Sequence, residues 1–77
     1  MASVEIEYCV PCGFRDRAID VQRAILAGVE RDLDSLTLVM GDHGVFRVSV
    51  DDETVYDKDE HDFDVDEVVR RVRGRLR

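Results

Sequence analysis

The sequence predicts a small α/β fold of the α+β two-layer sandwich type, in which both helices lie on one face of a four-stranded mixed sheet. Apolar residues alternate with polar ones in three segments, as in strands with one face exposed to solvent, and a fourth segment would close a hairpin with the third. In two other segments they recur at three- and four-residue steps, as in amphipathic helices. With 77 residues, 44% of them hydrophobic, the chain is expected to fold as a single domain over residues 1–77.

The first three predicted elements are a strand over residues 3–8, a helix over residues 14–33 and a strand over residues 35–40. Strand, helix, strand is the order of a βαβ unit, whose parallel strands need a right-handed crossover. The apolar positions are Val4, Ile6 and Tyr8 in the first strand, Ala18, Val21, Ile25, Val29 and Leu33 in the helix, and Leu36, Leu38 and Met40 in the second strand.

The second half of the chain predicts a hairpin and a final helix. The hairpin strands are expected over residues 45–50 and 54–58, and apolar residues at helical spacing then run from Val65 to Leu76. Asp64 followed three positions later by Glu67 is the pattern of a capping box.

The sheet face away from the helices is expected to be polar and exposed to solvent. If the first and third strands are neighbours, Arg47 lies near Glu5 or Glu7. The residues expected on this face are Glu5, Glu7, Thr37, Arg47 and Ser49.

The charge balance excludes some partners. Eighteen acidic residues against eleven Lys and Arg give a net charge of −7, which repels nucleic-acid phosphates. Such self-repulsion fits a host with a salty cytoplasm, a hypothesis that requires the melting temperature to climb with potassium chloride. No apolar run approaches the ~20 residues that cross a bilayer, and the first residues lack a secretory pattern. A cytoplasmic chain that binds neither nucleic acid nor membrane is therefore expected.

The motif that carries chemistry is Cys9-Val10-Pro11-Cys12, at the junction of a predicted strand and a predicted helix. A helix N-terminus presents unpaired N–H groups and partial positive charge, which favour a thiolate. We expect Cys9 at the mouth of the helix and Cys12 inside its first turn, within reach of a disulfide. Such a pair performs thiol–disulfide exchange, and we expect Cys9, as the exposed thiol, to attack and Cys12 to resolve.

Three other roles for the cysteines remain open: half of a structural zinc site, a static disulfide, or two buried and inert thiols. Zinc would need His43 and His61, but the chain has no second Cys-x-x-Cys and no His pair with ligand spacing. We therefore expect no metal and no other cofactor, and both histidines in solvated loops. The acidic stretch 57–66 lacks the calcium-loop pattern and is expected to be a hydrated loop.

The chain resembles the small thioredoxin-like Rdx proteins of the selenoprotein W family over nearly its whole length. The resemblance depends on residues 4–14, an apolar strand ending in Tyr-Cys-x-x-Cys-Gly-Phe, and on residues 44–48, which are similar to a Gly-x-Phe-x-Val strand. It implies a thioredoxin-like fold and a thiol redox role, with the active centre on Cys9 and Cys12. Selenocysteine, where the family has it, stands at the second position, so the resemblance implies that Cys12 carries the more reactive atom.

Two departures from related proteins concern partner binding. The family often has basic residues after the last strand, where residues 56–60 here are mostly acidic, and thioredoxin carries a proline facing its cysteines, whereas Pro11 is the only proline here. The expected partner is a protein or a low-molecular-weight thiol or disulfide. Phe14 is a candidate docking residue for it, or packs the first helical turn against the sheet. A non-enzymatic binding module whose cysteines sense redox state is the alternative function.

Overall fold

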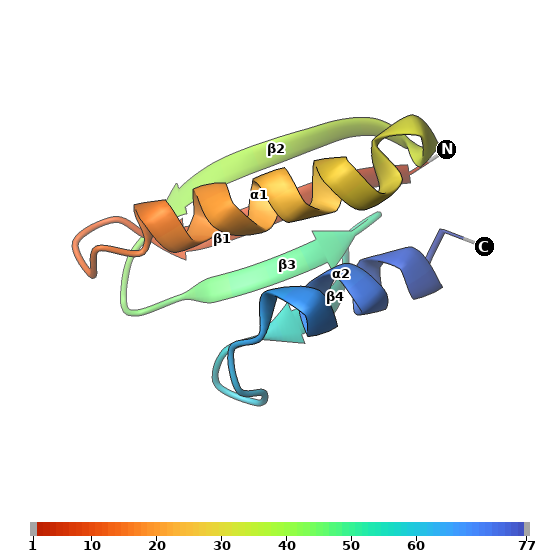
Figure 1. Ribbon diagram of the computed structural model, residues 1–77. Helices are drawn as coiled ribbons and strands as arrows, with labels where there is room; N and C mark the ends of the chain where they lie inside the picture. Colours follow the sequence, from red (N-terminus) through yellow and green to blue (C-terminus); the bar gives the residue numbers. More distant parts are fainter. Residues whose placement is uncertain (1, 77) are drawn as a thin grey trace.

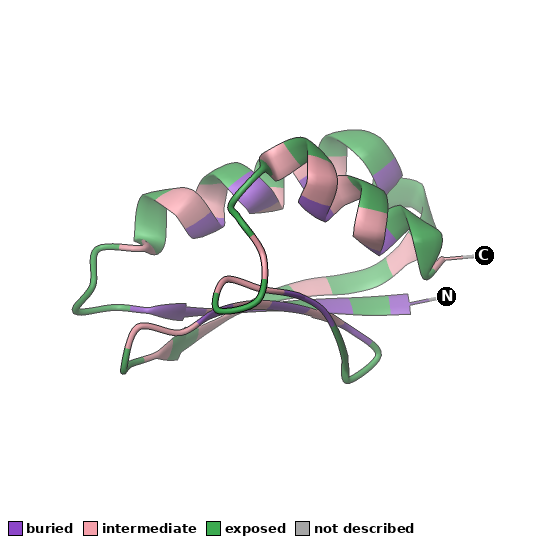
Figure 2. Ribbon diagram, turned by 90° about the horizontal axis from the view of Figure 1, so that it is seen from below, coloured by how far each residue is buried: buried purple, intermediate pink, exposed green. Residues whose placement is uncertain are grey.

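The computed structural model, described over residues 2–76, has a four-stranded sheet with two helices on one face (Figures 1 and 2). The strand order is β2-β1-β3-β4. β1 (Ala2–Cys9) lies parallel to β2 (Leu33–Gly41) and antiparallel to β3 (Phe46–Val50), and β4 (Glu53–Asp57) pairs antiparallel with β3 at the other edge. The mixed sheet and the two-layer α+β class predicted from the sequence are confirmed.

The first helix is shorter than predicted. α1 (Arg15–Val29) is followed by a 3-10 turn, η1 (Glu30–Asp32). Leu33 comes four residues after Val29 and so fits the helical spacing, but it begins β2 and pairs with Ala2. The predicted helix over residues 14–33 was therefore wrong at its end, because a strand residue continued the apolar period of the helix.

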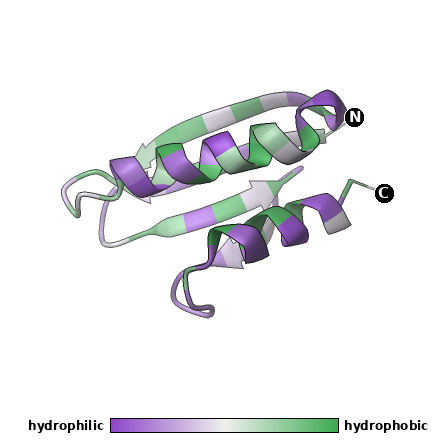
Figure 3. Ribbon diagram, in the orientation of Figure 1, coloured by the Kyte–Doolittle hydropathy of each residue, from purple (hydrophilic) through white to green (hydrophobic). Residues whose placement is uncertain are grey.

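The core lies between the sheet and the two helices. α1 runs along the side of the sheet that holds β1 and β2, and α2 (Val65–Gly74) lies over β3 and β4 (Figure 1). The loop that connects β4 to α2 is mostly hydrophilic (Figure 3). The buried side chains form one apolar cluster of Ala2, Val4, Ile6, Tyr8, Ala18, Val21, Ile25, Val29, Phe46, Val48, Val50, Val55, Tyr56, Val68 and Val72.

The opposite face of the sheet is polar, as predicted. Arg47 pairs with Glu7 on the neighbouring strand, with Nη1 3.2 Å from Oε1, because β1 and β3 are adjacent and these two residues face each other in register. The same guanidinium lies 3.5 Å from a carboxylate oxygen of Asp57 on β4. The expected contact between Arg47 and an acid of the first strand is confirmed.

The N-terminus of α2 is capped by Asp64. Its carboxylate accepts hydrogen bonds from the backbone N–H groups of Asp66 (3.0 Å) and Glu67 (3.4 Å). The Glu67 carboxylate forms ion pairs with Arg70 and Arg71 on the following turn. The predicted N-cap is therefore confirmed. The side chain of Glu67, which a capping box would turn back to the N-cap residue, forms ion pairs with the next turn of the helix instead.

Tyr56 makes the stability depend on alkaline pH. Its side chain is fully buried, and its hydroxyl donates to the backbone carbonyl of His61 at 3.4 Å. Burial raises the pKa of Tyr56 above its usual value of 10.0, partly offset by the positive charge of Arg17. The folded state thus holds a proton that the unfolded chain releases, so this stabilisation is complete below pH 10.0 and is lost as the pH rises through the raised pKa.

Tyr56→Phe should remove this dependence. Chemical unfolding of both proteins across the alkaline range is expected to show a free energy of unfolding that falls less steeply for the variant. Equal slopes for the two proteins would contradict the assignment to Tyr56.

Candidate functional site

A disulfide joins the two cysteines at the start of α1. Cys9 is the last residue of β1, and Cys12 lies in the turn formed by residues 10–13 that leads into the helix. Their Cα atoms are 5.3 Å apart, within the usual range for a disulfide. The expectation that the two sulfur atoms lie within bonding reach is confirmed.

The helix begins later than the motif suggested. α1 starts at Arg15 with Phe14 as its N-cap residue, so Pro11 and Cys12 precede the first turn and are not inside it. Gly13 has a φ of +78°, a left-handed conformation that a helix cannot contain. Its N–H donates to the carbonyl of Val10 at 3.1 Å, which closes the turn that carries Cys12 ahead of the helix.

Cys9 was expected to be the exposed cysteine, but the structure exposes Cys12 and buries Cys9. Cys9 is 0% exposed, and Cys12 is exposed. Cys9 is covered because it ends a central strand, where its N–H donates to the carbonyl of Val45 at 2.8 Å. The premise by which attack was assigned to Cys9 was therefore wrong.

Gly41 lets the loop before β3 close against this strand end. A Cβ atom at Gly41 would stand 2.9 Å from Cγ1 of Val45 and 3.0 Å from a carboxylate oxygen of Glu7. Its carbonyl accepts from the N–H of Val10 at 3.1 Å, immediately after Cys9. The glycine thus allows two segments that are distant in the sequence to enclose the first cysteine.

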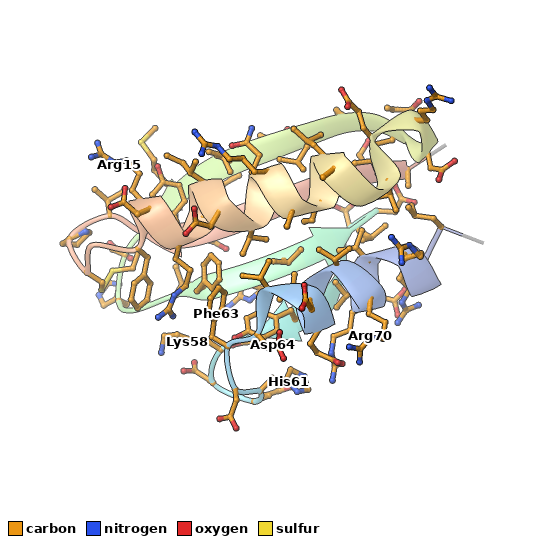
Figure 4. All side chains as sticks on the ribbon, in the orientation of Figure 1. Arg15, Lys58, His61, Phe63, Asp64 and Arg70 are labelled. Carbon is orange, nitrogen blue, oxygen red and sulfur yellow. A yellow bond between two sulfur atoms is a disulfide. The ribbon has the colours of Figure 1, made fainter. Side chains whose placement is uncertain are left out.

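Aromatic rings and an arginine connect the start of α1 to the core. The Phe14 ring is half-buried and meets the edge of Phe46, with 6.2 Å between ring centroids. The Arg17 guanidinium lies 4.9 Å from the Phe14 centroid and 4.4 Å from that of Phe63, which points toward α1 from the loop before α2 (Figure 4). Phe14 packs the helix start against the sheet, and its docking role stays a prediction. Sequence patterns did not single out Arg17, which they placed among the polar positions of the helix.

Two apolar side chains beside the disulfide are open to solvent. Met40 is 75% exposed and Val10 is 48% exposed. They line a groove of about 360 Å³ together with Tyr8, Gly13, Arg15 and Asp16. Met40 was expected on the apolar side of its strand with Leu36 and Leu38, but β2 extends to the point where α1 begins, so the helix does not cover its last apolar residue.

Neither histidine joins the cysteines in a group of metal-binding side chains in the described part of the chain. Within residues 2–76, no three His, Cys, Asp or Glu side chains are arranged to hold a metal ion. The exposed His43 contacts Asp42 in the turn before β3, and the His61 ring lies against Tyr56, with 5.8 Å between centroids. Over the same residues, neither helix is long and apolar enough to span a membrane.

Comparison with known proteins shows the family. The model of the Rdx family matches residues 3–74. The structure is similar to that of a protein from Bordetella parapertussis, with 28% identity, 96% of each chain covered and a TM-score of 0.88. It is also similar in fold to a selenoprotein W-related protein from Vibrio cholerae, with 18% identity, 99% of this chain and 98% of the other covered, and a TM-score of 0.89. None of the curated proteins compared with the chain matches it. The family match over almost the whole sequence, together with a fold and a Cys-x-x-Cys turn that agree with it, means that this chain belongs to the Rdx family.

Proposed function

We propose that this protein performs thiol–disulfide exchange, with Cys12 as the attacking thiolate and Cys9 as the resolving thiol. Membership of the Rdx family implies a thioredoxin-like redox role. The observation that carries the assignment within the pair is the difference in exposure, because a substrate disulfide reaches the exposed Cys12 and not the buried Cys9. The family resemblance, in which selenocysteine takes the second position of the motif, supports the same order.

The exchange proceeds in two steps and transfers two electrons. The Cys12 thiolate attacks one sulfur of a substrate disulfide, the S–S bond of the substrate breaks, and its other sulfur leaves as a thiolate that takes up a proton. The Cys9 thiol then loses its proton and attacks the Cys12 sulfur. The Cys9–Cys12 disulfide forms and the second substrate sulfur leaves. The protein is oxidised to the disulfide while the substrate is reduced to two thiols.

The N-terminus of α1 favours a negative charge on Cys12. The N-cap residue Phe14 has no side-chain oxygen, and no side chain caps the first N–H groups of the helix. These groups carry the positive end of the helix dipole and face the turn that precedes it. Arg15 and Arg17 add positive charge to the first turn, and Asp16 adds one negative charge. The partner is a protein or a low-molecular-weight thiol or disulfide whose sulfur reaches the exposed turn.

Trapping of the mixed disulfide tests the assignment. After incubation with an aromatic disulfide probe, Cys9→Ser is expected to retain one half of the probe on Cys12, because no thiol remains to release it. Cys12→Ser is expected to retain much less, because the remaining Cys9 is buried. Cys9→Ala serves as a second trapping variant, since it places no hydroxyl in the apolar site.

The outcomes separate the possible roles. Retention only in Cys12→Ser would reverse the assignment of attacking and resolving thiols. If no variant retains the probe and the wild-type pair does not cycle between dithiol and disulfide with a thioredoxin or glutathione system, the redox proposal fails.

A further inference from the structure

The resolving step of the exchange needs a group that takes up the proton of Cys9. A thiol with the ordinary pKa of about 8.5 is mostly protonated near neutral pH. Cys9 is 0% exposed, so bulk water does not touch its sulfur and cannot collect the proton directly. A base placed beside this buried thiol would speed the release of the substrate.

The side chain of Cys9 lies on the polar face of the sheet. Side chains alternate between the two faces along a strand. Tyr8 of β1 belongs to the apolar cluster under the helices, so Glu7 and Cys9, on either side of it, face the other way. Cys9 is accordingly buried without being part of that cluster. Glu7 and Cys9 thus share one face of the same strand.

The carboxylate of Glu7 reaches across β1. One of its oxygens, Oε2, lies 3.0 Å from the position that a Cβ atom of Gly41 would occupy. The other, Oε1, accepts a hydrogen bond from Nη1 of Arg47 at 3.2 Å. Gly41 belongs to β2 and Arg47 to β3, and β1 lies between these two strands. The carboxylate is therefore held over β1, the strand that ends in Cys9.

Gly41 is also the register partner of Cys9. The two residues pair in the parallel ladder, so their Cβ positions lie about 4.8 Å apart on the same face. Val45, whose carbonyl accepts from the N–H of Cys9 at 2.8 Å, places its Cγ1 2.9 Å from the same Gly41 position. Glu7 thus borders the enclosure that holds Cys9, within reach of the thiol directly or through one water molecule.

The charges around Glu7 favour uptake of a proton. Arg47 also lies 3.5 Å from a carboxylate oxygen of Asp57 on β4, so one guanidinium serves two carboxylates. Glu5 adds a further carboxylate to the same face of β1, and the β2 residues beside Glu7 are uncharged. When Glu7 takes up a proton, Arg47 and Asp57 remain together as a neutral pair.

We propose that Glu7 is the proton acceptor of the resolving step, an inference that rests on the proposed exchange between Cys9 and Cys12. As the Cys9 sulfur attacks the Cys12 sulfur of the mixed disulfide, its proton passes to the Glu7 carboxylate. The Cys9–Cys12 disulfide forms, the bond between Cys12 and the substrate sulfur breaks, and the substrate leaves as a thiolate. Glu7, whose side chain is 35% exposed, then gives the proton to water.

A single-turnover experiment separates the two steps. Reduced protein mixed with a nitroaromatic disulfide releases one coloured thiolate when Cys12 attacks and a second when Cys9 resolves. Glu7→Gln is expected to slow the second release about a hundredfold at neutral pH, within the range that a positioned proton acceptor contributes. Glu5→Gln, the same substitution at an exposed residue of the same strand face, is the matched control and should slow neither release.

Arg47→Gln tests whether the ion pair alone explains the effect. This variant breaks the contact between Arg47 and Glu7 from its other end but keeps the carboxylate. Its second release should stay close to that of the wild-type protein. Slowing equal to that of Glu7→Gln would assign the effect to the structure of the strand and overturn the proposal.

The pH dependence of the second release gives another readout. In Glu7→Gln this rate should rise about tenfold per pH unit between about pH 6 and 8, because Cys9 must then lose its proton to solvent. The wild-type profile should be flatter, because the carboxylate takes the proton. His43 titrates in this range, but it is exposed and pairs with Asp42 in the loop before β3, so it affects both proteins alike.

The remaining outcomes separate this proposal from the exchange itself. A second release that is unchanged in Glu7→Gln would overturn the role of Glu7. A faster second release would show that its charge only keeps the proton on Cys9, and would overturn that role as well. Absence of the first release from every protein would instead refute the exchange at Cys12.

Discussion

Phe46→Ala is expected to lower the free energy of unfolding by about 3–5 kcal/mol, as for other buried aromatic residues truncated to alanine. Phe46 is 0% exposed and is the ring on which the others meet. The ring centroids of Phe14, Tyr56 and Phe63 lie 6.2, 6.0 and 5.8 Å from its own. Truncation removes these contacts and leaves a cavity that the strands on either side cannot close. For a domain of 77 residues, this loss is most of the total free energy of unfolding.

Phe63→Ala is the matched control. Its ring touches the same cluster but is 37% exposed and lies on a loop that can adjust. Its loss should therefore cost roughly 1 kcal/mol, in the lower part of the range for single substitutions. Urea unfolding of the oxidised proteins at one fixed salt concentration measures both values. Similar losses for the two variants would show that Phe46 is not the centre of the aromatic cluster.

In the reduced protein, Cys12 is expected to react with iodoacetamide about a hundredfold faster than Cys9. Cys12 is open to solvent, whereas Cys9 is covered and becomes accessible only when the end of β1 separates from the loop that includes Val45. If this local opening costs about 3 kcal/mol, the open population is about one in a hundred. Mass spectrometry of peptides sampled over time gives both rates.

Controls for this measurement separate exposure from chemistry. In urea that unfolds the chain, the two cysteines should react at nearly equal rates, because burial no longer distinguishes them. Faster reaction of Cys9 in the folded protein would contradict the proposed order of attack and resolution. Equal rates in the folded protein would show that reduction opens the strand end.

Much of the fold could be predicted because the spacing of apolar residues along a short segment indicates a strand or a helix. Alternation of Val4, Ile6 and Tyr8 predicted β1, and this pattern matches the buried positions of the strand. Asp64 marked the start of α2, because a carboxylate before an apolar period is the usual signal of an N-cap. The pairing of Arg47 with Glu7 was expected once the first and third strands were taken as neighbours.

Other features could not be predicted from local sequence patterns, because they depend on which distant residues pack beside a given side chain. Val29 and Leu33 have helical spacing, yet pairing with Ala2 assigns Leu33 to a strand. Met40 continues the apolar face of its strand, yet no helix lies above it. Arg17 belongs to the polar side of a helical wheel, yet its guanidinium lies over the Phe63 ring of a distant loop.

By itself, the sequence determined the order of the strands and helices and the presence of two thiols three residues apart, because backbone periods and a short turn are local properties. Only the tertiary structure decided which sulfur meets solvent. Cys9 is enclosed by a loop more than thirty residues away, around Gly41 and Val45, while Cys12 stays outside on a turn held by Gly13. Burial is the sum of contacts from distant parts of the chain, and no spacing within the motif contains that information.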